Sequence, residues 1–435
     1  APEVLVPNPE TTKQQLKLLW ISCGDNDNLM SFSERTHLYL QQHRIPHIFY
    51  VEPGGHDFNV WKNDLYLFSQ LLFKPVDTSS FDKYGLHGTR AESNVRNSKY
   101  PQLTADHRAI FRIKAPDAQK VQIDLGRKYD MVRQEGGIWE TVTDSLGEGF
   151  HYYSLLIDGV VADPGSETFY GMGRMASGIE VPFKGGEYYA LKDVPHGDIR
   201  MKRYYSEVSR SWRRFFVYTP AGYDTHTTEK YPVLYLLHGG GEDERGWATQ
   251  GKTDLIMDNL IAEGKAKPML IIMLDGNMAS AGFNAGALKA FEAELMQAVI
   301  PFVEKNYRVR KEPDSRALAG LSMGGIQTLY AGLYHTDMFA HLGVFSSGWL
   351  PFYQKIADDQ YEFISKNKAA IDSQLRLLWI AMGGKEDIAY QNCQNMLKEF
   401  DTLKLKYTYS EYPGGHTWPV WRNNLYHFAQ LLFNK

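Results

Sequence analysis

The sequence predicts an α/β protein with a doubly wound, mostly parallel sheet, a small all-β sandwich and an N-terminal α/β fragment. Three observations lead to this prediction. Residues 213–383 contain near-continuous apolar runs that alternate with helical stretches, a pattern typical of a parallel sheet covered by helices on both faces. Residues 109–182 hold short β-rich runs. A segment near the N-terminus is repeated near the C-terminus.

Length and composition are those of an ordinary globular protein. The 435 residues are 43% hydrophobic and 23% charged, and the length suits two or three domains. The net charge is −4 and no stretch concentrates Lys or Arg, which argues against nucleic acid or anionic membrane as a partner. No apolar run reaches the roughly 20 residues that a membrane helix needs. The chain begins APEVLVPNPE, without Met or a signal peptide, so we expect a mature secreted form or a piece of a longer polypeptide.

The repeated segment carries a histidine in each copy. It reads EPGGHDFNVWKNDLYLFSQLLF at 52–73 and YPGGHTWPVWRNNLYHFAQLLF at 412–433. The similarity extends back to LKLLWISCGDND at 16–27 and LRLLWIAMGGKED at 375–387. Each copy predicts a buried strand, an acidic loop, a helix, a second strand, a Gly-Gly-His loop and a closing helix.

Domain borders are predicted where the residue composition and the spacing of Gly, Pro and Asp change. From Ala109 to about Pro182, β-type runs are separated by Gly, Pro and Asp at intervals of roughly 8–12 residues, as in a small sandwich. The expected organisation is a duplicated fragment at 1–80, a linker at 81–100, a β-module at 101–195 and an α/β domain at 196–435.

One serine has the sequence context of a nucleophile. In ALAGLSMGGIQTLYAGL, a predicted strand is followed by Gly320, Leu321, Ser322, Met323 and Gly324, and then by a predicted helix. Small residues two before and two after the serine permit a sharp turn that lifts its hydroxyl above the sheet. An ordinary glycine-rich turn is the alternative, which the flanking strand and helix disfavour.

A serine hydroxyl is a poor nucleophile until a base takes its proton. In the chain order Ser, Asp, His, the base follows the last strand. His416 in YPGGHTW fits this place, and two adjacent acids, Glu386 and Asp387, precede it. In the N-terminal copy, Asp27 precedes His56. Asp387 has the same spacing from His416, so we select Asp387 over Glu386.

The oxyanion that forms during acyl transfer needs preorganised N–H donors. The backbone N–H of Met323 is one expected donor. The other is expected from LLHGGGEDERGW at 236–247, where we select Gly240, although the sequence leaves open which glycine points inward. Metal ligation is not expected, because GDNDNLMSFSE lacks the sixth-position Gly of a calcium loop and no Cys/His cluster occurs.

These stretches carry a family resemblance. YPVLYLLHGGGEDERGW, GLSMGG and YPGGHTWPVWRNNLYHFAQLLF resemble the esterase D-like α/β-hydrolases of carbohydrate esterase family one, which includes feruloyl and acetylxylan esterases of bacteria that degrade plant cell walls. FRIKAPDAQKV, HYYSLLIDGVVADP and VPHGDIR resemble the glycogen-binding-like, immunoglobulin-type module that precedes such domains in Bacteroidetes. The likeness covers approximately residues 100–435.

The resemblance implies an α/β-hydrolase fold and an ester hydrolase without metal or cofactor, secreted or periplasmic. Its implied substrates are ferulate or acetate esters on xylan or arabinoxylan side chains. The family's triad carries onto Ser322, Asp387 and His416, and its oxyanion donors carry onto Gly240 and Met323.

The first eighty or so residues depart from the family pattern. They resemble the last third of a second esterase domain whose nucleophile-bearing part is missing, so we expect esterase domains in tandem, with this chain starting inside the first. Such a piece cannot cover both faces of its own strands. We expect it to dock on another surface, to pair with another chain, or to be poorly ordered.

Candidate substrate contacts are aromatic and acidic. Trp418 comes two residues after the proposed base, and packing beneath the histidine loop is its alternative role. Glu244 and Trp247 lie in the loop of the proposed oxyanion donor. The loops at 275–287 and 349–370 are expected to shape the acyl pocket.

The leading hypothesis is a feruloyl esterase. An acetylxylan esterase is a close alternative, and so is an enterobactin-type siderophore esterase. The latter's anionic ferric substrate would favour a basic cleft, whereas GEDERGW is rich in acids. A glycan-binding protein with a degenerate hydrolase fold is the non-enzymatic alternative. Trp139, Tyr152 and Tyr153 are candidates for stacking on sugar, although alternate strand residues of this type more often belong to the core.

Overall fold

The computed structural model describes residues 6, 8–43, 45–74, 88–95, 98–182, 184–278 and 284–434. The chain divides into two compact units, residues 1–121 with 129–146 and residues 122–128 with 147–435. The borders proposed at residues 80, 100 and 195 stay predictions. Parts of the predicted linker, residues 81–87 and 96–97, lie outside the described residues.

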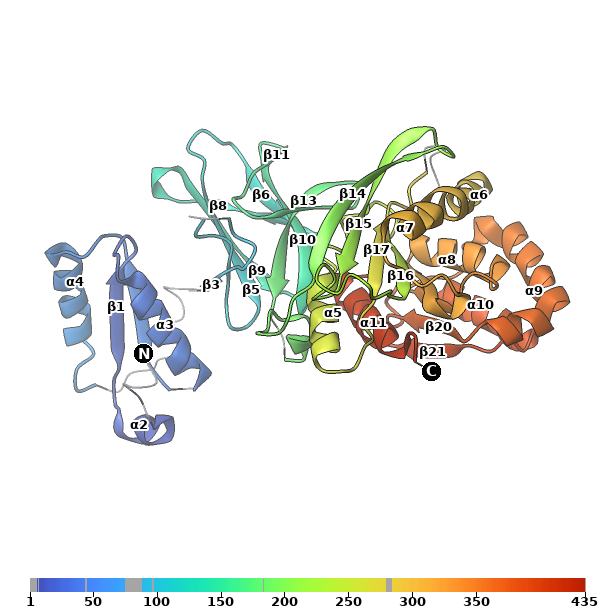
Figure 1. Ribbon diagram of the computed structural model, residues 1–435. Helices are drawn as coiled ribbons and strands as arrows, with labels where there is room; N and C mark the ends of the chain where they lie inside the picture. The colour runs from blue at the N-terminus through green and yellow to red at the C-terminus, as the bar shows by residue number, and fades with distance from the viewer. Residues whose placement is uncertain are drawn as a thin grey trace. The chain divides into compact units, whose positions relative to one another are not determined.

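The first unit begins with the N-terminal copy of the repeat, in which helices pack on two parallel strands (Figure 1). The strands pair in register from Trp20–Ile48 to Gly24–Glu52. The elements are α2 (Pro9–Gln15), β1 (Trp20–Gly24), α3 (Met30–Gln42), β2 (Ile48–Glu52) and α4 (Phe58–Ser69). The order of strand, helix, strand and helix predicted for this copy is confirmed.

Two β-sheets follow, as the short β-rich runs predict. The sheet of the first unit has the order β3–β4–β5–β9–β8, with the strands β3 (Thr89–Arg90), β4 (Gln102–Leu103), β5 (Arg108–Lys114), β8 (Val132–Arg133) and β9 (Ile138–Ser145). The other sheet has the order β12–β13–β10–β6–β7, and β11 also pairs with β10. Its strands are β6 (Val121–Asp124), β7 (Lys128–Asp130), β10 (Gly149–Ile157), β11 (Val160–Ala162), β12 (Thr168–Gly171) and β13 (Arg174–Val181).

An eight-stranded sheet forms the centre of the second unit, in the order β14–β15–β17–β16–β18–β19–β20–β21. The hairpin β14–β15 pairs antiparallel with β17, and the neighbours from β17 to β21 are parallel. The strands are β14 (Asp198–Ser206), β15 (Ser211–Thr219), β16 (Val233–Leu237), β17 (Leu270–Leu274), β18 (Arg316–Leu321), β19 (His341–Phe345), β20 (Leu377–Met382) and β21 (Thr408–Glu411). The predicted mostly parallel sheet is confirmed.

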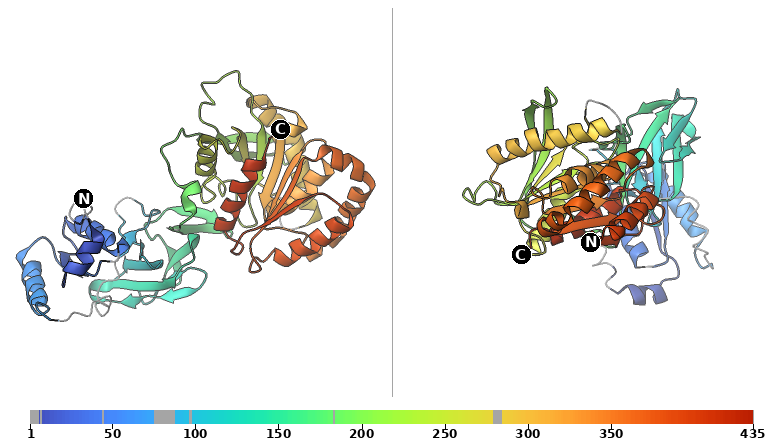
Figure 2. Two further views of the ribbon diagram at one scale, coloured as in Figure 1. Left: turned by 90° about the horizontal axis from the view of Figure 1, so that it is seen from below. Right: turned by 90° about the vertical axis from the view of Figure 1, so that its right-hand side faces the viewer.

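Helices cover both faces of this sheet (Figure 2). Alternate residues of β16 enter different cores: Tyr235 joins a cluster with residues of α6 to α10, and Leu236 joins one with residues of α5 and α11. The helices are α5 (Thr253–Ala262), α6 (Ala285–Glu294), α7 (Ile300–Asn306), α8 (Met323–Tyr334), α9 (Gln354–Gln374), α10 (Tyr390–Thr402) and α11 (Trp418–Leu431). In the described ranges, no helix combines the length and the apolar character that crossing a membrane requires.

A buried ion pair joins helix α11 to strand β13 inside the second unit. The guanidinium of Arg422 donates to both carboxylate oxygens of Glu180, at 2.8 and 3.1 Å, and its Nε donates to the Gln250 carbonyl at 2.7 Å. Phe150 of β10 belongs to the same apolar cluster as the α11 residue Leu425. Strands β10 and β13 therefore share a core with a helix that covers the central sheet.

Candidate active site

Ser322 lies at the turn between strand β18 and helix α8. Its backbone has φ 52° and ψ −113°, and α8 begins at the next residue. A positive φ is uncommon for a residue with a side chain, and it marks a turn that the surrounding structure must hold in place. The sequence predicted this sharp strand-to-helix turn.

The flanking glycines are required by close packing. A Cβ on Gly320 would lie 2.5 Å from the Gly324 backbone, and one on Gly324 would lie 2.7 Å from the His238 carbonyl oxygen. Real Cβ atoms do not approach so closely, so neither position accepts a larger residue without a shift of the backbone. The Gly-x-Ser-x-Gly pattern is therefore a steric requirement of this turn.

Asp387 and His416 form a hydrogen-bonded pair in the loops after β20 and β21. His416 Nδ1 lies 2.8 Å from Asp387 Oδ1, which also accepts the Ala389 backbone N–H at 2.9 Å. Burial alone would raise the pKa of the Asp387 carboxyl, but the hydrogen bonds from His416 and Ala389 outweigh it and hold that pKa below its ordinary value. Glu386 is exposed and accepts the Gly414 backbone N–H at 3.1 Å instead.

The segment after β19 lies between the serine and the acid. The Ser347 hydroxyl donates to the Ser322 carbonyl at 2.8 Å, and the Ser346 side chain adjoins the Asp387 carboxyl. All of these residues follow the carboxyl ends of neighbouring parallel strands, which is where open α/β sheets place their ligand sites.

A cavity of about 330 Å³ opens beside the serine turn. It is lined by both proposed oxyanion donors, Gly240 and Met323, and by Gly241, Gly276, Asn277, Met278, Ala287, Leu288, Gln327 and Tyr353. Gly239 donates its backbone N–H to Glu242 Oε2 at 3.1 Å, so it is not available to a substrate. Gly240 as the second oxyanion donor stays a prediction, since Gly240 and Gly241 both line the cavity.

The sequence of the second unit matches a known family. The family model described as "Putative esterase" matches residues 206–430, which is more than half of the chain. An endo-1,4-beta-xylanase/feruloyl esterase of Xylanibacter ruminicola is 36% identical over 360 residues, which cover 78% of this chain and 47% of the relative.

The chain belongs to the putative esterase family.

A second relative of this esterase is endo-1,4-beta-xylanase Y of Acetivibrio thermocellus, 26% identical over 271 residues that cover 56% of the chain and 24% of the relative. The chain thus spans about half the length of the first of these relatives and about a quarter of the second.

Solved structures share the fold of the esterase. The feruloyl esterase module from Clostridium thermocellum complexed with sinapinate is 25% identical with a TM-score of 0.50, covering 58% of this chain and 93% of that one. A CE1 ferulic acid esterase from Anaeromyces mucronatus in complex with ferulic acid is 25% identical with a TM-score of 0.50, covering 58% and 96%. Enterobactin esterase from Shigella flexneri is 18% identical with a TM-score of 0.55, covering 75% and 92%, and this likeness extends to the fold alone. The α/β-hydrolase fold expected from the sequence is confirmed.

The three residues proposed as substrate contacts are buried in the esterase. Trp418 is 2% exposed and packs edge-on between Trp247 and Trp421, with ring centroids 5.2 Å from each. Trp247 donates its indole N–H to the Leu237 carbonyl at 2.9 Å, and Glu244 forms an ion pair with Arg214. None of the three lines the cavity beside Ser322. Their burial favours a packing role for these side chains, which for Trp418 is the alternative given above.

Strand β10 and the turn between β12 and β13 contribute residues next to the site, among them Tyr152, which the sequence suggested as a platform for sugar. Tyr152 of β10 accepts the Trp418 indole N–H at 3.1 Å and the Gln250 side-chain N–H at 2.6 Å, so it does not serve as an exposed platform for sugar. Gly173, in the turn between β12 and β13, donates its N–H to the Gly241 carbonyl at 2.7 Å. These contacts join segments that are far apart in the chain, so no local sequence pattern predicts them.

The loops expected to shape the acyl pocket are only partly described. Met278 and Tyr353, one from each loop, line the cavity. Residues 279–283 of the first loop lie outside the described residues.

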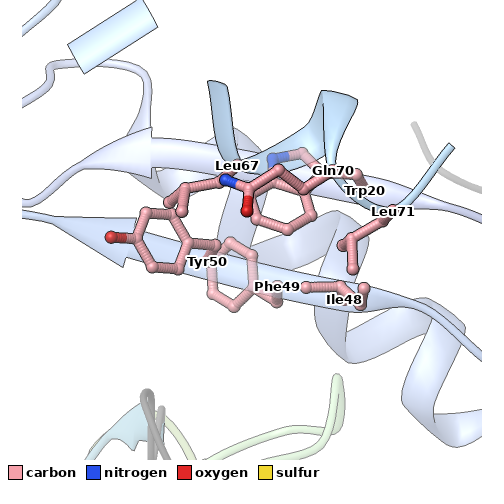
Figure 3. A pocket seen from close by; sticks show the side chains of 7 residues that line it. All are labelled: Trp20, Ile48, Phe49, Tyr50, Leu67, Gln70 and Leu71. Carbon is pink, nitrogen blue, oxygen red and sulfur yellow. The ribbon is translucent and has the colours of Figure 1, made fainter. Parts of the chain in front are cut away.

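The N-terminal copy repeats the acid–histidine pair but not its surroundings. An apolar pocket of about 350 Å³ lies between α4 and the strands β1 and β2, lined by Trp20, Ile48, Phe49, Tyr50, Leu67, Gln70 and Leu71 (Figure 3). In the C-terminal copy the counterpart of Trp20 is Trp379, which packs on Phe345 of β19 with ring centroids 5.6 Å apart. Within the described residues β1 pairs only with β2, so Trp20 has no such neighbouring strand.

Proposed function

We propose that this chain hydrolyses carboxylic esters with Ser322 as nucleophile, His416 as general base and Asp387 as the acid that orients the histidine. The observation that carries the proposal is the Asp387–His416 pair, 2.8 Å between Oδ1 and Nδ1, at the same sheet edge as the strained Ser322 turn. Because Asp387 occupies Nδ1, the ring presents its other nitrogen, Nε2, to a hydroxyl.

The reaction has two halves. His416 Nε2 takes the Ser322 proton while Oγ forms a bond to the ester carbonyl carbon, and the backbone N–H groups of Gly240 and Met323 donate to the oxyanion. The protonated histidine then gives its proton to the leaving alkoxide as the ester C–O bond breaks. Water repeats the sequence on the acyl-enzyme, releasing the acid and restoring the serine.

The proposed substrates are feruloyl esters on arabinoxylan side chains. A relative at 36% identity is named for both xylanase and feruloyl esterase activity, and two structures with the same fold were solved with sinapinate or ferulic acid. The cavity beside Ser322 combines apolar walls from Met278, Leu288 and Tyr353 with the glycine backbone, which suits an aromatic acyl group. A xylan substrate would be met in a secreted or periplasmic setting.

The test compares three substrates with one enzyme. We expect kcat/KM to be at least tenfold higher for methyl ferulate and feruloylated arabinoxylan fragments than for an aryl acetate, because only the aromatic acyl group fills the cavity. Ser322→Ala should remove nearly all turnover of each. Preference for the acetate would instead indicate an acetylxylan esterase, and hydrolysis of the ferric siderophore alone would indicate the enterobactin-type activity. A Ser322→Ala variant with a tenth of the wild-type kcat would exclude this nucleophile.

A further inference from the structure

The Glu242 carboxyl lies against Gly239 in the loop that carries the proposed oxyanion donor. The proposed reaction assigns it no proton transfer and no contact with substrate. Its side chain is 5% exposed, and its Oε2 accepts the Gly239 backbone N–H at 3.1 Å. The position of a Cβ on Gly239 would be 3.6 Å from that oxygen and 3.4 Å from the Ser322 Cβ. The carboxyl therefore holds the first glycine of the loop within van der Waals reach of the nucleophile.

A buried carboxyl is costly unless it is hydrogen-bonded or paired. Among the described residues, no Lys or Arg forms an ion pair with Glu242. The carboxyl instead faces the hydroxyl of Tyr152 and the indole N–H of Trp418, with His238 and His416 nearby. Because burying a carboxyl is costly, its presence here indicates a role that an apolar side chain could not fill.

Tyr152 is arranged to serve this carboxyl. Its hydroxyl oxygen accepts N–H groups from Trp418 at 3.1 Å and from Gln250 at 2.6 Å. With both donors directed at the oxygen, the single hydroxyl hydrogen is free to be donated. The Glu242 carboxyl lies near this hydroxyl and interacts with it electrostatically, which helps to raise the pKa of Tyr152. Tyr152 of strand β10 therefore adjoins the carboxyl that accepts the Gly239 N–H.

A second contact holds the same loop from the same sheet. The Gly173 N–H donates to the Gly241 carbonyl at 2.7 Å, and a Cβ on Gly241 would meet the Gly173 nitrogen at 3.0 Å. The loop of Gly239 to Gly241 is therefore fixed at its first residue by Glu242 and at its last by the β12–β13 turn. The middle residue, Gly240, is the proposed oxyanion donor.

We propose that Glu242, held by Tyr152, is a positioning residue for ester hydrolysis that fixes the loop carrying the oxyanion donor Gly240. This inference rests on the proposed function, because the loop has a catalytic role only if Ser322 forms a tetrahedral intermediate. Glu242 touches neither substrate nor reacting atoms, and it acts through the Gly239 backbone.

The experiment measures kcat and KM separately on methyl ferulate for Glu242→Ala, Glu242→Gln and Tyr152→Phe in the full chain. A displacement of about 1 Å at a catalytic group costs up to about a hundredfold in rate. Glu242→Ala should therefore lower kcat by about tenfold to a hundredfold with KM within twofold. Glu242→Gln should recover part of kcat, since its amide oxygen still accepts the Gly239 N–H. Tyr152→Phe should fall between the two.

Tyr153→Phe is the matched control. Tyr153 is the next residue of β10 and is also buried, but its hydroxyl is hydrogen-bonded to Ser166. We expect this variant to keep wild-type kcat even if its melting temperature falls. The rate of Ser322 labelling by a fluorophosphonate should fall in parallel with kcat in the Glu242 and Tyr152 variants, because that reaction also places negative charge on an oxygen in the oxyanion site.

Three outcomes would overturn the proposal. The first is kcat within twofold of wild type in both Glu242→Ala and Tyr152→Phe, with Ser322→Ala inactive, which leaves the proposed function intact. The second is a loss of kcat that disappears on cooling, or that Tyr153→Phe shares, which would mark general destabilisation. The third is full activity in Ser322→Ala, which would remove the proposed function and this role together.

Discussion

His56 Nδ1 lies 2.8 Å from Asp27 Oδ2, so the N-terminal copy of the repeat contains a formed acid–histidine pair. The Leu29 backbone N–H also donates to Asp27, and this bond, with that from His56, holds the pKa of the carboxyl below its ordinary value. The two copies differ in exposure: the His56 side chain is 53% exposed, against 17% for His416. The local fold of the repeat is thus enough to bring the acid and the histidine together.

We predict that His56→Ala leaves esterase activity unchanged. The N-terminal copy was predicted to lack a serine at a strand-to-helix turn, so His56 has no hydroxyl to activate within its own segment. The measurement is kcat/KM on a soluble ferulate ester, with His416→Ala as the matched control, which should lose nearly all activity. A tenfold loss in His56→Ala would show that the segment contributes to the active site.

Mutation should distinguish the roles of the two adjacent acids, Glu386 and Asp387. Asp387→Asn should lower kcat by about 10⁴-fold, the scale seen when a triad acid can no longer hold the correct tautomer of its histidine. Glu386→Gln should cost far less, because the exposed Glu386 accepts the Gly414 N–H, whereas Asp387 contacts His416. The measurement is kcat of both variants by steady-state kinetics. A larger loss of kcat in Glu386→Gln than in Asp387→Asn would identify Glu386 as the acid.

Asp387 should also contribute to stability in a pH-dependent way. Its folded pKa is lowered by the His416 and Ala389 hydrogen bonds despite burial. A depressed pKa stabilises the fold above the unfolded value, about 3.9, and the contribution is lost as pH falls through the folded pKa. Urea unfolding of wild type and Asp387→Asn should differ by a constant free energy above about pH 5 and converge below about pH 4. A difference that stays constant as the pH falls well below the unfolded value would contradict the assignment.

Trp418 should behave as a packing residue. Trp418→Ala should lower the free energy of unfolding by about 3–5 kcal/mol, since it empties a buried aromatic site. Trp418→Phe should lose less, because a ring still fills the space between Trp247 and Trp421. Denaturant unfolding and KM on feruloylated oligosaccharides test this together. A raised KM in Trp418→Phe with unchanged stability would restore the predicted substrate contact.

Sequence reasoning agrees with the structure where the signal is local. The strained turn at Ser322 follows from glycines that are two residues away, and the Asp387–His416 contact follows from an internal repeat, while the role of Asp387 in catalysis stays a prediction. The parallel strands follow from runs of apolar residues that need cover on both faces.

The roles of Trp418, Glu242 and Tyr152 were not predictable in the same way. Trp418 meets Tyr152 across 266 residues of chain, and a single sequence holds no record of that contact. Proximity to His416 made Trp418 look like a substrate contact, but sequence distance does not say on which side of a loop a ring lies. Glu242 belongs to the acidic stretch GEDERGW, and nothing in that stretch distinguishes this carboxyl, which is buried, from its neighbours.

The buried ion pair offers a further prediction. Glu180→Ala should destabilise the fold by about 3–5 kcal/mol, because it leaves the Arg422 charge buried without its partner. Arg376 and Asp314 form an exposed pair at 3.2 Å, and Asp314→Ala should cost about 0–1 kcal/mol as the control. Thermal and denaturant unfolding compare the two. Equal costs would show that Arg422 is compensated by its other contacts.

The same pair limits how the chain can be divided or recombined. Arg422 donates to both carboxylate oxygens of Glu180 on strand β13. A fragment that begins at residue 196 would lack Glu180, so the buried Arg422 charge would have no carboxylate partner. Exchange of modules between relatives would therefore succeed only when both halves of the charge pair travel together. In gene shuffling we therefore expect residues 147–435 to be exchanged as one unit, although the sequence predicts a border near residue 195.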